Sequence, residues 1–146
     1  MNRGITFIEL LLVVAIILTL GIMSVSFYSR FLTQNSVDNT VTKLVQSFRK
    51  AQVYSMTGKQ NGVWGVKYVS TPPPHKIVLY LTGNTAFDES FSVNDNITIS
   101  GFTDISFAKA TGIRIPSIPD TITITISGDN STKTVTINSQ GVVSRQ

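Results

Sequence analysis

The sequence predicts an α+β chain, in which a long N-terminal helix is followed by an antiparallel β-sheet or β-sandwich. Three observations predict this fold class. An apolar run covers residues 5–25 and contains Glu9 as its one charge. Apolar residues then recur at spacings of three and four as far as Ala51, and from Asn61 onward the spacing changes to two. A chain of 146 residues is long enough for one globular domain beside an extended helix.

The apolar run predicts a helix that spans a membrane. Residues 5–25 would form a helix roughly 30 Å long at about 1.5 Å per residue, which matches the hydrocarbon core of a bilayer. We therefore expect the first half of the long helix to be transmembrane, with lipid as its first partner.

Residues 26–57 predict an amphipathic continuation of the same helix. No proline occurs before Pro72, and the first strong helix breakers after the periodic stretch are Gly58 and Gly62. One face carries an apolar stripe that a sheet could cover, so we expect the β domain to pack on this second half only. The stripe consists of Val37, Val41, Leu44, Val45, Phe48 and Ala51.

Residues 58–146 predict a globular antiparallel β domain. The clearest strand, residues 121–126, alternates isoleucine with threonine, which suits a sheet that has one buried and one exposed face. Pro116 and Pro119 confine residues 113–120 to an edge strand or a loop. The expected strands are residues 63–69, 76–81, 96–100, 104–108, 121–126, 132–137 and 141–143.

Composition excludes several classes of site. Lys and Arg number 12 against 8 Asp and Glu, a net charge of +4, and the basic residues are scattered rather than clustered. This pattern does not predict a nucleic-acid surface. The chain has no cysteine, which excludes disulfides, thiolate metal ligands and thiol nucleophiles. We therefore expect no nucleic-acid partner and a body that is stabilised by packing alone.

The residues that most often carry catalysis or bind metals form no recognised pattern. His75 follows three prolines, and no serine or carboxylate pattern beside it predicts a catalytic dyad. Asp88, Glu89 and Asp95 could supply oxygens to calcium, but their spacing matches no known calcium loop. Trp64 opens an alternating strand, which favours a core position over a ligand platform. We predict no enzyme activity, no cofactor and no metal.

The first nine residues carry the most specific pattern. A short basic leader ends in Gly4, and Ile5, Thr6, two apolar residues and Glu9 follow at the head of the apolar helix. This pattern resembles the type III signal of type IV pilins and type II secretion pseudopilins, whose prepilin peptidase cleaves after the glycine on the cytoplasmic side and methylates the new N-terminus. The resemblance implies a cleaved leader of residues 1–4, N-methylation of Ile5 and a pilin-like fold.

Glu9 stands out on physical grounds as well. An ionised carboxylate is costly inside an apolar membrane segment, and a short glutamate side chain snorkels poorly, so Glu9 requires a cationic partner. Cleavage would free the Ile5 ammonium, and in the family the ammonium of one subunit pairs with this glutamate of its neighbour. The resemblance therefore implies an assembly charge pair at Glu9. The alternative is that Glu9 only marks the cytoplasmic edge of the membrane.

The body has a looser resemblance to the GspH/FimT group of minor pseudopilins, whose helix runs into a β-sandwich. Its positions are residues 48–52, residues 64–66, residues 105–107 with Gly112, and the closing hairpin over residues 135–143. The resemblances imply a structural subunit, a minor one, of a type IV pilus or type II secretion pseudopilus. The implied partners are prepilin peptidase, other subunits through the helix, and an inner-membrane assembly platform. The implied location is the inner membrane, with the N-terminus in the cytoplasm and the body outside, and then the filament.

Three other interpretations remain open. A minor pilin that captures DNA would use cations near the C-terminus, where Arg145 stands, with Arg114 and Lys133 as candidates to lie near it. A singly anchored membrane protein that never polymerises would keep an uncut N-terminus. A secretory signal peptide would be cleaved after Ser26, where small residues follow the apolar run, and the mature chain would begin at Phe27.

Overall fold

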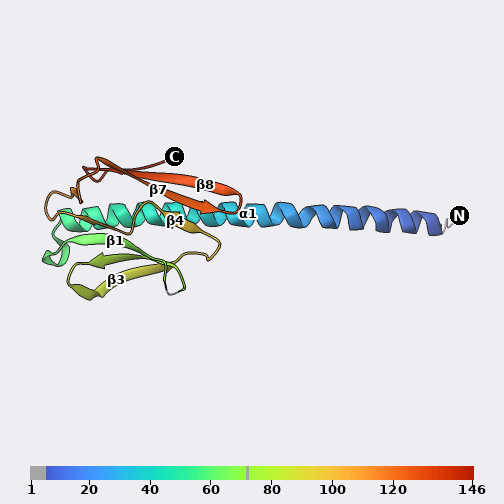
Figure 1. The fold of residues 1–146 in the computed structure, drawn as a ribbon. Helices are drawn as coiled ribbons and strands as arrows, with labels where there is room; N and C mark the ends of the chain where they lie inside the picture. Colours follow the sequence, from blue (N-terminus) through green and yellow to red (C-terminus); the bar gives the residue numbers. More distant parts are fainter. Residues whose placement is uncertain (1–5, 72) are drawn as a thin grey trace. The chain divides into compact units, whose positions relative to one another are not determined.

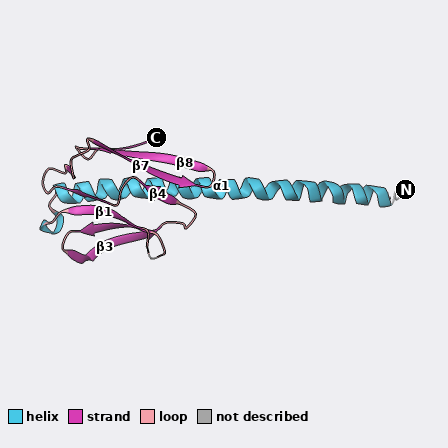
Figure 2. Cartoon of the chain, viewed as in Figure 1, coloured by secondary structure: helices cyan, strands magenta, loops and turns pink. Residues whose placement is uncertain are grey.

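The computed structural model describes residues 6–71 and 73–146, and of residues 22–27 it describes the backbone alone. The fold is α+β with antiparallel sheets, as the sequence predicts (Figures 1 and 2). The chain divides into two compact units, Met1–Leu32 and Thr33–Gln146, which we call the N-terminal unit and the body. Each unit is described by itself below.

Helix α1 covers Phe7–Met56, and a short 3₁₀ helix η1 follows at Lys59–Asn61. The end of α1 follows from Gly58, which adopts the left-handed conformation (φ +66°) and donates its N–H to the carbonyl of Ser55 at 3.2 Å. Within the body, the predicted apolar stripe of α1 is buried at all six positions, with at most 7% of any side chain exposed. The second half of the helix therefore packs as predicted.

The strands of the body form two antiparallel sheets rather than one. The first sheet has five strands, in the order β3 (Asn84–Ser92), β2 (Lys76–Leu81), β1 (Trp64–Val69), β5 (Asp104–Phe107) and β6 (Arg114–Ile115). The second sheet has four, in the order β4 (Thr98–Ser100), β7 (Thr121–Gly128), β8 (Ser131–Asn138) and β9 (Val143–Arg145).

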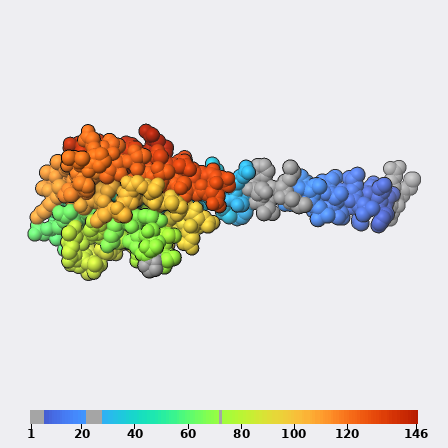
Figure 3. Space-filling model, viewed as in Figure 1, coloured from blue at the N-terminus to red at the C-terminus, as the bar shows by residue number. Residues whose placement is uncertain are grey.

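The core of the body lies where both sheets meet α1. In Figure 1 the body's part of α1 lies between the ribbons of the two sheets, and in Figure 3 the strands hide most of these helix residues. Phe48 of α1 contacts Phe102 and Phe107 edge to face, with ring centroids 5.5 and 6.4 Å apart. From the second sheet, Ile124 and Ile137 join the same buried cluster. One helix thus supplies the apolar surface against which both sheets close.

Most predicted strands are confirmed, and two differences have physical reasons. Strand β3 was not predicted, because it is an exposed edge strand without an alternating apolar face. The last strand was expected at residues 141–143 but covers Val143–Arg145, because Gly141 (φ +82°) is still part of the turn after β8. Strand β6 is an edge strand within the proline-containing segment, which is one of the two options that the sequence predicts.

Candidate functional site

The predicted processing site lies outside the described residues, since Gly4 and Ile5 are not among them. The third predicted site residue, Glu9, lies in the first turn of α1 and is exposed. The structure therefore gives a geometry for the predicted assembly residue and none for the cleavage site.

Glu9 forms a capping box with Thr6, the residue immediately before α1. The Glu9 Oε2 atom accepts hydrogen bonds from the Thr6 backbone N–H and from the Thr6 hydroxyl, both at 2.9 Å. The Glu9 N–H in turn points to Thr6 Oγ1 at 3.3 Å, and the carbonyl of Thr6 accepts the first helical bond from Leu10 at 3.2 Å. Among the described residues, no group donates to the other carboxylate oxygen, Oε1. The Thr-x-x-Glu spacing could have predicted this cap, and the sequence analysis missed it.

The helix behind Glu9 is apolar all round. Every residue from 7 to 21 is exposed, and its large apolar side chains have exposed fractions of 45 to 77%. Glu9 is the one charged residue in this stretch, and the hydroxyl of Thr19 donates to the carbonyls of Ala15 and Ile16 at 3.1 and 2.9 Å. A helix without a polar face is typical of an apolar environment.

The predicted membrane-spanning segment, residues 5–25, is described only in part. Ile5 and the side chains of residues 22–25 lie outside the description. Across the described residues, no helix combines the length and the apolarity that crossing a membrane requires.

Of the body residues considered for chemistry or ligand binding, Trp64, His75 and Glu89 have structural contacts. Trp64 is buried, and its Nε1 donates to the carbonyl of Lys59 at 2.9 Å, so its predicted core position is confirmed. The His75 ring stacks on Tyr68, with ring centroids 6.3 Å apart. Glu89 forms an ion pair with Lys50. In the described part of the chain, no three His, Cys, Asp or Glu residues lie close enough together to hold a metal ion.

Arg114 has a structural role that the sequence did not reveal. Its side chain is fully buried, and its guanidinium donates to four backbone carbonyls, those of Asn138, Pro116, Ser117 and Pro119. Burial lowers the pKa of Arg114, and the charge of Asp120 partly offsets this effect. Because the side chain is fully buried and four of its five N–H donors are engaged by backbone carbonyls, the interpretation that Arg114 joins a DNA-binding surface beside Arg145 is wrong.

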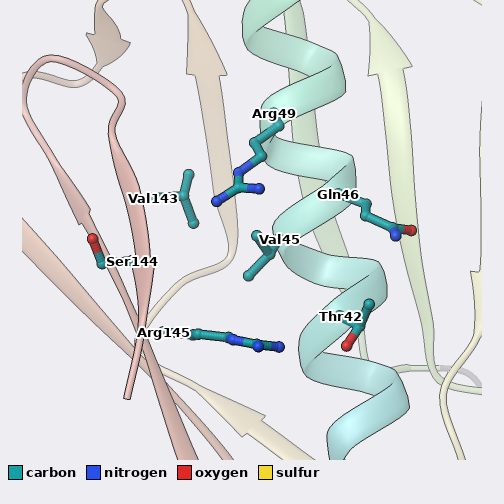
Figure 4. A pocket seen from close by; sticks show the side chains of 7 residues that line it. All are labelled: Thr42, Val45, Gln46, Arg49, Val143, Ser144 and Arg145. Atoms are coloured by element: carbon teal, nitrogen blue, oxygen red, sulfur yellow. The ribbon is translucent and has the colours of Figure 1, made fainter.

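A groove lies in the body between α1 and the edge strand β9 (Figure 4). Its volume is about 540 Å³, within the usual range of ligand sites. Arg49 projects into it from α1 and Arg145 from β9, and neither guanidinium has a partner among the described residues. The other lining residues are Thr42, Val45, Gln46, Val143 and Ser144.

A second cavity of about 420 Å³ shares Thr42 and Arg145 with this groove. Lys133 lines the second cavity, so the prediction that Lys133 lies near Arg145 is confirmed. The carboxylate of Asp38, which lines the same cavity from α1, is 3.5 Å from the Lys133 ammonium. Among the charged side chains that line the two cavities, those of Arg49 and Arg145 have no oppositely charged partner in the described part of the chain.

The described residues thus offer two candidate sites of different chemistry. One is a capped carboxylate at the head of an apolar helix, and the other is a cationic groove in the body. Comparisons with known protein families, with curated proteins and with solved structures found no match. The function is therefore argued from these residues.

Proposed function

We propose that this chain is a structural subunit of a type IV pilus or type II secretion pseudopilus, a minor one, which prepilin peptidase processes at Gly4-Ile5. One observation carries the proposal. Glu9 is the single charged residue of an exposed apolar helical stretch, residues 7–21, and it lies at the head of that stretch. The pattern of the first nine residues, which resembles the prepilin signal, supports the same conclusion.

The exposed apolar side chains require a cover. Burial of apolar surface contributes about 25 cal/mol per Å², and none of the residues 6–21 is buried within its own unit. We propose that lipid of the inner membrane covers this surface first, with the N-terminus in the cytoplasm, and that equivalent helices of other subunits cover it in the filament. Assembly would then exchange one apolar environment for another, so packing and polar contacts decide the register between subunits.

Glu9 can supply the polar contact that sets this register. Its Oε2 atom is engaged by Thr6, whereas no described residue donates to Oε1. One carboxylate can therefore cap its own helix and still accept a bond from the Ile5 ammonium of a neighbouring subunit. In this proposal the cap holds the side chain at the helix start, where a neighbour's N-terminus can reach it.

The architecture of the body is compatible with a pilin-like fold. The amphipathic part of α1 lies under two antiparallel sheets, and its apolar stripe is fully used by them. Residues 7–21 belong to the N-terminal unit, where their apolar side chains are exposed. We propose that the partners of these side chains are the helices of other subunits and, before assembly, an inner-membrane assembly platform.

Mass spectrometry of the mature N-terminus tests the processing step. The chain is produced in cells that contain a prepilin peptidase, and the N-terminal peptide is sequenced. The expected peptide begins with N-methylated Ile5. An intact Met1 would favour a singly anchored protein, and a chain that begins at Phe27 would indicate a secretory signal peptide; either result overturns the proposal.

Two matched variants at the capping box separate helix capping from charge pairing. Glu9→Gln keeps a side chain that can complete the cap but removes the charge, because glutamine also serves at this position of a capping box. Thr6→Ala removes the capping hydroxyl but keeps the charge. We expect Glu9→Gln to insert into membranes and fail to enter filaments, whereas Thr6→Ala still assembles. Recovery of the two variants in sheared filament fractions measures this, and normal incorporation of Glu9→Gln refutes the charge pair.

A further inference from the structure

We propose that the groove between α1 and β9 binds an extended, carboxylate-bearing segment of a partner protein, which adds to the free edge of β9. The inference goes beyond filament assembly through the helix, because it concerns residues of the body alone. Figure 4 shows the groove, with α1 as one wall and β9 as the other.

One edge of β9 is unpaired, because β9 is the last strand of its sheet. On one side β9 pairs with β8, where Gln146 and Thr134 exchange backbone hydrogen bonds at 2.9 and 3.1 Å. Backbone groups of an antiparallel strand alternate in direction, so those of Val143 and Arg145 point away from β8. No described residue bonds to them. They form a short row of free donors and acceptors of the kind that an added strand uses.

The groove carries unpaired positive charge. Arg49 and Arg145 approach the groove from opposite walls, and neither is paired with a carboxylate in the described part of the chain. The one acidic side chain nearby, Asp38, lies beside Lys133 at 3.5 Å. Guanidinium groups bind carboxylates through two parallel hydrogen bonds, so two acidic side chains of one ligand segment could each engage one arginine.

The chemistry of the groove suits a peptide better than a nucleic acid. The free backbone groups of β9 can supply a hydrogen-bond ladder to a peptide strand, which a nucleic acid cannot form. A nucleic acid would instead require several phosphate contacts, and the groove offers two unpaired cations. The groove therefore favours an acidic peptide over a nucleic acid.

A peptide-binding measurement tests the charge argument. The full chain in detergent micelles is titrated against a fluorescent peptide of alternating valine and glutamate, with a valine–glutamine peptide as the control ligand. Arg49→Gln with Arg145→Gln should weaken binding of the glutamate peptide about tenfold, because two exposed ion pairs are lost together. Lys76→Gln, which removes an exposed cation from the other sheet, should leave it unchanged. Equal binding of both peptides, or no effect of the arginine variants, overturns the proposal.

A second pair of variants tests strand addition. Arg145→Gln and Arg145→Pro both lack the guanidinium, but Arg145→Pro also lacks the outward N–H, and proline is tolerated on an edge strand. Arg145→Pro should bind the peptide at least about threefold more weakly than Arg145→Gln, on the scale of one hydrogen bond. Equal affinities would refute addition to β9. The peptide is also competed with a single-stranded oligonucleotide. If the oligonucleotide displaces the peptide and its binding weakens steeply with salt, the groove binds phosphate and the proposal is overturned. Neither outcome affects the test at Glu9.

Discussion

Replacement of Arg114 by methionine should destabilise the body by about 3 kcal/mol, on the following reasoning. The guanidinium makes four hydrogen bonds to backbone carbonyls, and bonds from a charged donor contribute about 1.5 kcal/mol or more each, about 6 kcal/mol in total. Three of these carbonyls belong to the exposed residues Pro116, Ser117 and Pro119, so water can partly replace the lost donor there and recover about half of the total. The carbonyl of Asn138 is less accessible, and its loss remains.

The assay is thermal and urea unfolding of the full chain in detergent micelles, followed by the fluorescence of the buried Trp64. For a body of this size, about 3 kcal/mol corresponds to a fall in Tm of roughly 12 °C. Arg49→Met is the matched control, because it makes the same chemical change at an exposed arginine without a partner among the described residues, and it should stay within about 0.5 kcal/mol of the wild type. If Arg114→Met has the same Tm and the same urea midpoint as this control, the carbonyl contacts of Arg114 do not stabilise the body and the prediction is refuted.

Two further predictions concern stability. Ser55→Ala should lower the free energy of unfolding by about 1–2 kcal/mol, because the buried Ser55 hydroxyl accepts a hydrogen bond from the backbone N–H of Trp64 at 2.8 Å. Alanine would leave that backbone amide unpaired. An unchanged urea midpoint would contradict this prediction. Burial, and then the hydrogen bond to Asp104, raises the pKa of Tyr80 above its ordinary value of 10.0, and burial likewise raises the pKa of Tyr68. The folded body therefore keeps these phenols protonated where the unfolded chain ionises them, so stability is complete below about pH 10 and is lost as the pH rises further. Tyr80→Phe should make this alkaline loss of stability smaller without abolishing it, because Tyr68 still contributes. The free energy of unfolding is measured at about pH 9, 10 and 11. An equal fall in the variant and the wild type would refute the assignment to Tyr80.

The sequence predicts the elements of this fold better than their arrangement. Alternation reveals which face of a strand is buried, so β7 was predicted with Ile124 and Ile126 inward, as observed. It does not reveal partners: β1 pairs with β5, while β4 belongs to the other sheet. Strand β3 gives no alternating signal because it is an edge strand that is mostly exposed on both faces, and only Gly83 before it marks a turn.

The two candidate sites also differ in how far the sequence predicts them. Glu9 is visible in the sequence because a charge inside an apolar run is anomalous, and its cap follows from local spacing to Thr6. The groove depends on long-range packing, since Arg49 and Arg145 are almost a hundred positions apart and become neighbours only when β9 closes over α1. Arg114 resembled any other surface cation in the sequence, because its burial depends on the chain reversal at residues 116–119.

The shared stripe on α1 has a consequence for how the body folds. The pairings β1–β2, β2–β3 and β7–β8 join strands that are adjacent in the chain, so these hairpins can form early and at low entropic cost. Neither sheet can bury its apolar face until residues such as Leu44 and Phe48 are in place, since both sheets pack on the same helix. Helix docking should therefore be the cooperative, rate-limiting event, and a chain whose α1 is held elsewhere would have two half-formed sheets with exposed apolar faces.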